Sequence, residues 1–85
     1  MTWTIRYERE AERAIDAMDP PMRRRILLAI GGLSRDPRGA ANVKAMLGQN
    51  RYRLRVGDWR VIYELHDDVL MILVVRIGHR SEVYR

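Results

Sequence analysis

Hydrophobic and polar residues alternate along residues 52–65, which form the clearest periodic stretch of the chain. The segment reads Y-R-L-R-V-G-D-W-R-V-I-Y-E-L, with Gly57-Asp58 between two alternating runs. Alternation of this kind is typical of strands that bury one face, and glycine tolerates the positive φ that a two-residue hairpin turn requires. The pattern therefore predicts a β-hairpin in which Val56 lies opposite Trp59. Counting away from the turn, the further predicted pairs are Arg55 with Arg60, Leu54 with Val61, Arg53 with Ile62 and Tyr52 with Tyr63.

The predicted hairpin places Arg53, Arg55 and Arg60 together on the face opposite to the apolar and aromatic one. Like charges directly opposite each other destabilise a β-ladder. One interpretation is a solvated outer face, which is the usual state of an antiparallel sheet. The other is an anion-binding site, because guanidinium groups donate paired hydrogen bonds to phosphate oxygens. The hairpin alone leaves both interpretations open.

The rest of the chain predicts two helices and two more strands. Residues 3–7 alternate like a strand, and apolar residues at 11, 14, 15 and 18 have helical spacing. Pro20 and Pro21 start a second helix with an apolar stripe from residue 22 to 33. Residues 34–50 read as a connecting loop with a helical turn at 42–47, and residues 69–77 as a strand that Gly78 ends. The predicted fold is α+β, in the order β-α-α-β-β-β, with the N-terminal strand and helical hairpin packed on a mostly antiparallel twisted sheet.

Arg23, Arg24 and Arg25 lie in the first turns of the second predicted helix. The helix dipole disfavours cations there, so their presence is a mild cost unless they meet an anion. We interpret this triplet as a solvated helix face.

Length and composition narrow the class of protein. A chain of 85 residues predicts a single domain spanning residues 1–85, and without cysteine it has neither disulfides nor thiolate metal sites. The longest apolar run is too short to span a membrane and the N-terminus has no signal-peptide pattern, so we expect a soluble, cytoplasmic protein. A net charge of +5 and a pI near 10.4 favour an anionic partner, with ribosomal, DNA-binding and acidic-protein partners all open.

Several motifs, taken in order, resemble the RelE branch of the RelE/ParE toxin superfamily. They are the hairpin at 52–65, V-R-I-G-H-R-S-E-V-Y at 75–84, D-P-P at 19–21, S-R-D-P-R at 34–38 and K-A-M-L-G at 44–48. The resemblance implies a RelE-like fold and the toxin of a type II toxin–antitoxin system, an mRNA interferase that enters the ribosome and cuts mRNA in the A site. It further implies a cognate antitoxin that holds the toxin inactive and, as a complex with it, binds operator DNA. We expect no cofactor, no metal site and no membrane association.

The resemblance also assigns site residues. The catalytic set that it implies is Arg53, Arg55, Arg60, Arg80 and Tyr84, and the RNA-binding set is Lys44, Arg51 and His79. Attack of a 2′-hydroxyl on the adjacent phosphate develops negative charge that fixed cations can stabilise.

One departure from the family pattern concerns proton transfer. The best-known RelE toxins have lysines at the positions of Arg53 and Arg55, and arginine is a poor proton donor or acceptor near neutral pH. That leaves Tyr84 and His79 as titratable candidates in the C-terminal motif. Tyr84 either packs the end of the sheet, stacks on a base or helps to activate the hydroxyl. His79 is either catalytic or structural, and we expect His66 to be exposed and inert.

Two other functions stay open on the sequence. One is a ParE-like inhibitor of DNA gyrase that shares the fold but not the catalytic face. The other is a catalytically weak homologue that serves as an antitoxin-binding co-repressor, which the missing lysines allow.

Overall fold

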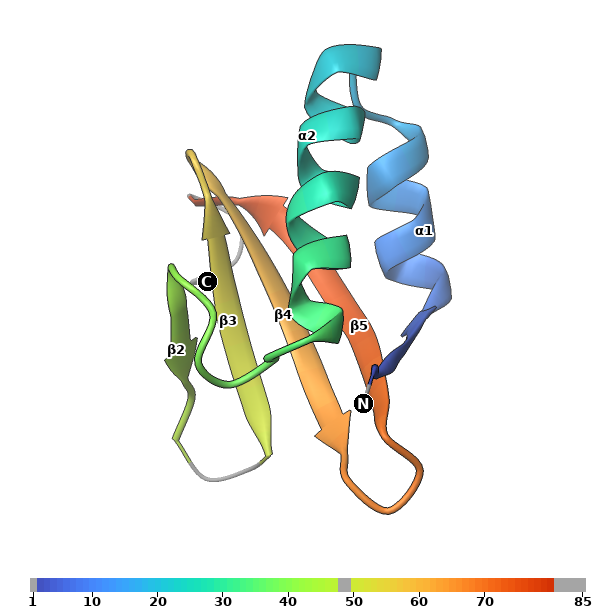
Figure 1. Cartoon of the computed structure of the whole chain (residues 1–85). Helices are drawn as coiled ribbons and strands as arrows, with labels where there is room; N and C mark the ends of the chain where they lie inside the picture. Colours follow the sequence, from blue (N-terminus) through green and yellow to red (C-terminus); the bar gives the residue numbers. More distant parts are fainter. Residues whose placement is uncertain (1, 48–49, 81–85) are drawn as a thin grey trace.

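The computed structural model describes residues 2–47 and 50–80, arranged as two helices over one face of a sheet (Figure 1). In chain order the elements are β1 (Thr4–Tyr7), α1 (Arg9–Asp16), α2 (Pro20–Gly31), the 3₁₀ helix η1 (Gly32–Ser34), β2 (Val43–Ala45), β3 (Arg51–Val56), β4 (Trp59–His66) and β5 (Met71–His79). The strand order is β1-β5-β4-β3-β2, with β1 parallel to β5 and the other pairs antiparallel. The predicted α+β fold is confirmed, with one more strand than predicted.

The extra strand is β2, where a helical turn was predicted. That prediction is wrong, because residues 43–45 pair with the free edge of β3, placing Lys44 opposite Arg53. Asn42 precedes the strand with a φ of 67°, in the left-handed region that asparagine tolerates better than most residues. Its carbonyl oxygen accepts a hydrogen bond from the backbone N–H of Arg55 at 2.9 Å. Three residues are too few for alternation to be recognised in the sequence.

The β3–β4 hairpin has the predicted register, from Val56 opposite Trp59 to Tyr52 opposite Tyr63. Gly57 has a φ of 60°, as the turn requires. The predicted division into faces is also confirmed, because the side chains that turn toward the helices are buried. They are Leu54, Val56, Val61 and Tyr63, with Tyr52 and Trp59 packed against them.

The β4–β5 pair contains a bulge at Val75. Tyr63 pairs with Val74 while Ile62 pairs with Arg76, so β5 has one residue more than β4 at this point. The bulge lets Val74 and Ile77 both join the core despite an odd spacing. The strand also runs to His79, so the prediction that Gly78 ends it is wrong; Gly78 pairs with Arg60 instead.

The core lies between the helices and the sheet. Its largest fully buried side chains are Tyr63, Ile26, Ile30, Leu33, Ile72, Val61 and Val74. The hydroxyl of Tyr63 donates a hydrogen bond to the carbonyl oxygen of Pro37, and burial raises its pKa well above the usual value. No helix in the described part of the chain is long and apolar enough to cross a membrane.

Arg23 corrects the interpretation of the arginine triplet as a solvated face. Its guanidinium donates hydrogen bonds to the carbonyl oxygens of Ile15, Asp16 and Met18, each at 3.1 Å. These carbonyls lie at and just after the C-terminal end of α1, where helical hydrogen bonds end; that of Ile15 also accepts the backbone N–H of Met18 at 3.1 Å. Arg23 therefore caps α1 and ties the two helices together, whereas Arg24 and Arg25 are exposed.

Candidate functional site

The face of the sheet turned away from α1 and α2, here called the outer face, is strongly basic. The strands contain seven basic residues, whose registers place them on this face: Arg6, Lys44, Arg51, Arg53, Arg55, Arg60 and Arg76. Across the five strands that the structure describes, Glu64 is the only acidic residue. The outer face therefore suits a polyanion.

Four of the predicted site residues meet in one pocket on this face. The pocket has a volume of about 330 Å³ and is lined by Asn42, Val43, Lys44, Arg53, Arg55 and Arg60. We call it the arginine pocket. Its cations come from three neighbouring strands, because Lys44 faces Arg53 across the β2–β3 ladder and Arg55 faces Arg60 across the β3–β4 ladder.

Backbone carbonyls at the hairpin turn help to position two of these guanidinium groups. The carbonyl oxygen of Gly57 accepts hydrogen bonds from Arg55 Nε at 3.4 Å and from Arg60 Nη1 at 3.3 Å. Arg60 Nη1 also donates to the carbonyl oxygen of Trp59 at 3.2 Å. A carbonyl orients a guanidinium without neutralising its charge.

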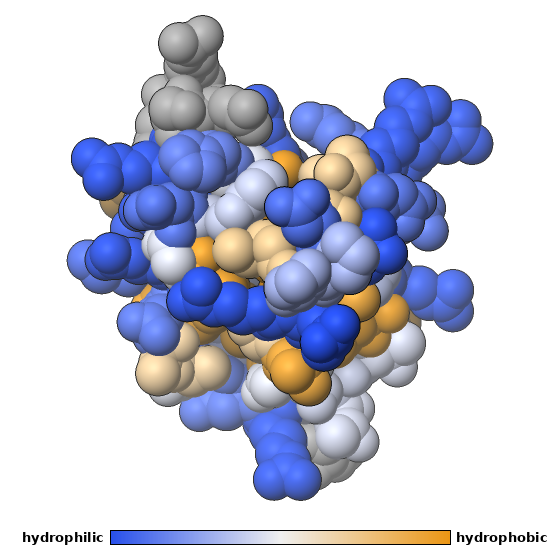
Figure 2. All heavy atoms as spheres, turned by 90° about the horizontal axis from the view of Figure 1, so that it is seen from above, coloured by the Kyte–Doolittle hydropathy of each residue, from blue (hydrophilic) through white to orange (hydrophobic). Residues whose placement is uncertain are grey.

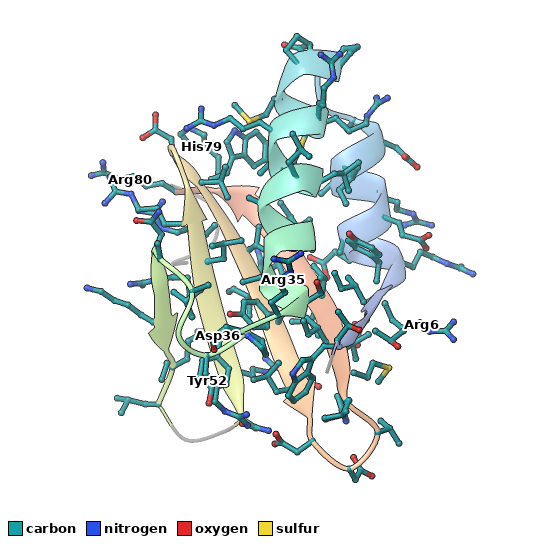
Figure 3. The ribbon with its side chains drawn as sticks, viewed as in Figure 1. Arg6, Arg35, Asp36, Tyr52, His79 and Arg80 are labelled. Carbon is teal, nitrogen blue, oxygen red and sulfur yellow. The ribbon has the colours of Figure 1, made fainter. Side chains whose placement is uncertain are left out.

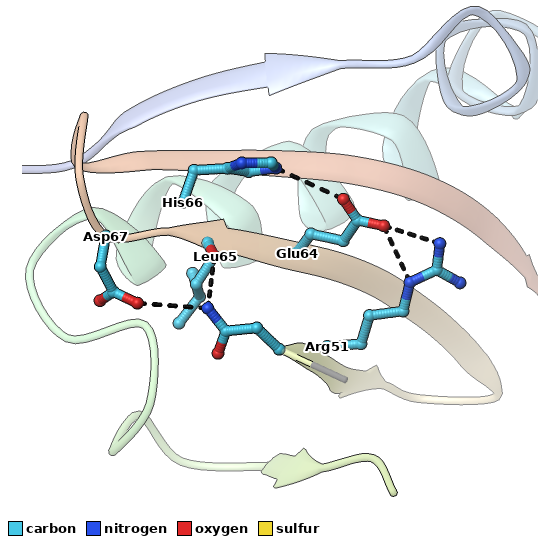
Figure 4. Close-up of polar contacts among 6 residues, drawn as sticks. Arg51, Glu64, Leu65, His66 and Asp67 are labelled. Atoms are coloured by element: carbon cyan, nitrogen blue, oxygen red, sulfur yellow. Dashed lines mark hydrogen bonds and ion pairs between the residues drawn. The ribbon is translucent and has the colours of Figure 1, made fainter. Parts of the chain in front are cut away.

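Arg51 lies on the same face but in a different environment (Figure 4). Its Nε and Nη2 donate to Glu64 Oε2 at 2.9 and 2.6 Å, and His66 Nε2 lies 3.3 Å from Glu64 Oε1. The His66 contact lacks hydrogen-bond geometry, so it is an ion pair only when the imidazole is protonated. His66 is half-buried at the end of β4, not exposed as predicted. Within residues 2–47 and 50–80, no group of three or more His, Asp or Glu side chains is arranged to hold a metal ion.

The C-terminal site residues separate from one another (Figure 3). The backbone N–H of Arg80 donates to the carbonyl oxygen of Asp58 at 2.7 Å, which holds the exposed Arg80 beside the hairpin turn. His79 instead pairs with Trp59, with ring centroids 5.8 Å apart and an edge-on angle of 84°. It therefore shares the helix-side face with Trp59, away from the arginine pocket. Tyr84 lies outside the described residues.

Arg25 is a cation near the site that sequence reasoning missed. A second pocket of about 330 Å³ lies between α2 and β3, and both Arg25 and Arg55 line it. The helical position of Arg25 gave no signal of this, because its approach to β3 depends on how α2 packs on the sheet.

A polar cluster at the opposite end of β3 ties two loops together. Arg38 donates to Asp67 Oδ2 at 2.8 Å and to the hydroxyl of Tyr52 at 2.9 Å, and its guanidinium lies over the ring of Trp3. The hydrogen bond from Arg38 holds the pKa of Asp67 below its usual value. This cluster connects the loop before β2 to the β4–β5 turn and contributes no residue to the arginine pocket.

Comparison with known proteins places these features in a family context. The family described as "ParE toxin of type II toxin-antitoxin system, parDE" matches residues 3–84. Toxin RelG of Mycobacterium tuberculosis is 26% identical over 86 residues, covering 100% of this chain and 99% of RelG.

Solved structures give the same fold. The archaeal RelE–RelB complex from Pyrococcus horikoshii OT3 matches with a TM-score of 0.83 and 24% identity, over 98% of this chain and 100% of the other. A mutant of E. coli toxin RelE in the free state matches with a TM-score of 0.84 and 16% identity, over 99% of this chain and 90% of the other. At these identities the likeness extends to the two helices and the twisted sheet.

Proposed function

The chain belongs to the ParE toxin family of type II toxin–antitoxin systems, within the RelE/ParE superfamily, and we propose that it acts as a ribosome-dependent endoribonuclease. It cleaves mRNA in the ribosomal A site and so inhibits translation in the cytoplasm. The arginine pocket is the observation that supports this function, because four cations from three strands line one space.

Attack of the 2′-hydroxyl explains why such a pocket suits RNA. The 2′-oxygen bonds to phosphorus, the bond from phosphorus to the 5′-oxygen breaks, and a cyclic phosphate and a 5′-hydroxyl result. Negative charge grows on the phosphoryl oxygens in the transition state, and the guanidinium groups of Arg53, Arg55 and Arg60 stabilise it. Arg80, beside the hairpin turn, adds a fourth arginine to the same end of the sheet.

Proton transfer needs a group that arginine cannot supply. Among the described residues that line the arginine pocket, Lys44 is the one cation of a residue type that can act as a proton donor. We assign it as the general acid that protonates the leaving 5′-oxygen. The 2′-hydroxyl proton passes to a separate base. The described residues that line the pocket include no carboxylate and no histidine, and Tyr84 stays a prediction for that role.

An antitoxin is the proposed protein partner. Relatives with this fold have been solved as complexes with RelB, including those from Pyrococcus horikoshii and E. coli. The strands bring seven basic residues to the outer face and one acidic residue, Glu64. This face therefore suits an acidic segment that covers the arginine pocket. The complex, through the antitoxin, would bind operator DNA.

Inhibition of DNA gyrase is the second candidate, favoured by the match to the family described by the name ParE. Such a toxin would need no phosphate-binding pocket for catalysis. The cations of the arginine pocket favour RNA cleavage over this alternative.

The deciding experiment compares both activities with the same preparation. Purified toxin is mixed with programmed ribosomes under single-turnover conditions, with naked mRNA as the control, and gyrase supercoiling is assayed in parallel. A-site cleavage that requires the ribosome is the expected result. Cleavage of naked mRNA, or intact mRNA together with blocked supercoiling, would contradict the proposal.

A further inference from the structure

Three guanidinium groups from three elements gather around Gly57. Arg55 and Arg60 donate hydrogen bonds to its carbonyl oxygen. On its other side, the two terminal nitrogens of Arg25 lie 3.4 Å from the position that a Cβ atom would occupy. Figure 2 views this end of the molecule and shows hydrophilic side chains around a small hydrophobic patch. The guanidinium groups of Arg25 and Arg55 can each donate paired hydrogen bonds to a bound anion.

The second pocket, here called the tip groove, begins where the arginine pocket ends. Asn42 and Arg55 line both spaces, so a ligand can pass from the outer face to the groove without leaving the surface. Alanine side chains form the accessible apolar part of the groove wall, while Arg25 and Arg55 supply its charges. The remaining lining residues are Ala29, Gly32, Leu33, Ala40, Ala41, Leu54, Val56 and Gly57.

We propose that the tip groove is a second nucleotide-binding subsite, in which Arg25 and Arg55 hold a phosphate next to the scissile one and the apolar wall receives the base. This inference rests on the proposed RNA-cleaving function. It extends the RNA path from β2–β4, over the hairpin turn, to α2. Arg25 is then an RNA-binding residue of a helix that otherwise serves the core.

The chemistry of the lining favours RNA over an acidic peptide. Unpaired RNA presents a flat apolar base and a phosphate at each repeat, and proteins bind it by joining cationic contacts to apolar or aromatic surfaces. The tip groove has this combination, with Arg25 and Arg55 beside the accessible side chains of Ala29, Ala40 and Ala41. The scissile phosphate in the arginine pocket and the nucleotide in the tip groove belong to one RNA strand, so the strand runs directly from one pocket into the other.

Salt-dependent binding tests the subsite without a ribosome. The ligand is a labelled 2′-O-methyl RNA of about ten nucleotides, which cannot be cleaved and is long enough to span both pockets. Each lost phosphate contact lowers the slope of log affinity against log salt by about 0.7 for a single strand. We expect this loss for Arg25→Ala and for Arg55→Ala. Arg25→Lys should keep the wild-type slope because it keeps the charge.

Arg24→Ala is the matched control, because Arg24 is exposed on the same helix and lines neither pocket. It should bind RNA as the wild type does, and Arg25→Ala should keep the wild-type melting temperature. Equal slopes for Arg24→Ala and Arg25→Ala, or no RNA binding by the wild type at low salt, would overturn the subsite. Normal RNA binding by Arg25→Ala with weakened antitoxin binding would assign the groove to a protein instead. Failure of A-site cleavage alone would remove the ribosomal function and leave Arg25-dependent RNA binding intact.

Discussion

Lys44 and Arg53 are direct partners across the β2–β3 ladder, and at the residue scale the proposed mechanism gives these two cations different roles. Both side chains carry positive charge, but lysine alone can donate a proton in the accessible pH range. Alternation along β3 and β4 predicted that Arg53, Arg55 and Arg60 share a face. It could not place Lys44 among them, since the pairing of β2 depends on the path of a long loop.

Replacing Lys44 separates charge from proton transfer. Lys44→Arg keeps the positive charge and removes the proposed general acid, so we expect A-site cleavage to slow by about 10²-fold, the lower end of what a general acid contributes. Single-turnover cleavage in programmed ribosomes measures it. The double variant Lys44→Arg/Arg53→Lys moves the lysine across the ladder and should recover part of the rate. Unchanged cleavage by Lys44→Arg would show that Lys44 acts as a charge only.

Removing a single pocket arginine tests charge stabilisation. Arg60→Ala should slow A-site cleavage by a factor on the order of 10² because it removes a donor aimed at growing negative charge. Arg76→Ala is the control, because Arg76 lies on the outer face but does not line the arginine pocket. Equal losses for the two variants would mean that the outer face acts through its total charge.

Tyr63 makes the stability of the fold depend on pH in the alkaline range. Burial raises the pKa of its hydroxyl, so the unfolded chain ionises at a lower pH than the folded one. The stabilisation is therefore complete below the unfolded pKa of about 10 and is lost as pH rises through the higher folded value. Tyr63→Phe should cost about 1–2 kcal/mol at neutral pH, because the Pro37 carbonyl loses its donor, and should flatten the decline above pH 10. Urea unfolding at neutral and alkaline pH measures both effects, and equal pH dependence in the two proteins would contradict this account.

At the scale of elements, local rules predicted some features and tertiary contacts decided others. The β3–β4 hairpin was predictable because a two-residue turn fixes the register. The helices were predictable from apolar residues at helical spacing and, for α2, from the two prolines at its start. The strand β2 and the bulge at Val75 were not predictable, because each depends on its partner strand and not on its own sequence. The capping role of Arg23 and the position of Arg25 were missed for the same reason.

The two faces of the hairpin predict opposite responses to mutation. Val61 is fully buried, so Val61→Asp places an unpaired charge in the core and should unfold the chain. Arg60→Ala, one residue away on the outer face, should keep the fold. Far-ultraviolet circular dichroism measures the helical signal of each variant. Equal loss of that signal in both would mean that the outer face also carries the stability of the sheet.

At the scale of the whole molecule, charge is distributed unevenly. The net charge is +5, and the five strands contribute seven basic residues and one acidic residue to the outer face. An acidic partner that binds there is attracted from a distance, which raises its association rate at low salt.

Antitoxin association should therefore slow as salt rises. Stopped-flow mixing of toxin with its cognate antitoxin should give a rate constant that falls by tenfold or more as salt shortens the Debye length from about 10 Å to about 3 Å. The dissociation rate should change much less. An association rate that is indifferent to salt would place the antitoxin contact away from the outer face.

The parallel pairing of β1 with β5 joins the first strand of the chain to the last. Contacts so distant in sequence form late in folding, since the intervening chain must be ordered first. A nascent chain lacks Ile72, Val74 and Ile77, and with them the part of the core that β5 supplies, until β5 has been synthesised. On the proposed function, such a chain would be unable to cut the message from which it is being translated, because its sheet is still incomplete.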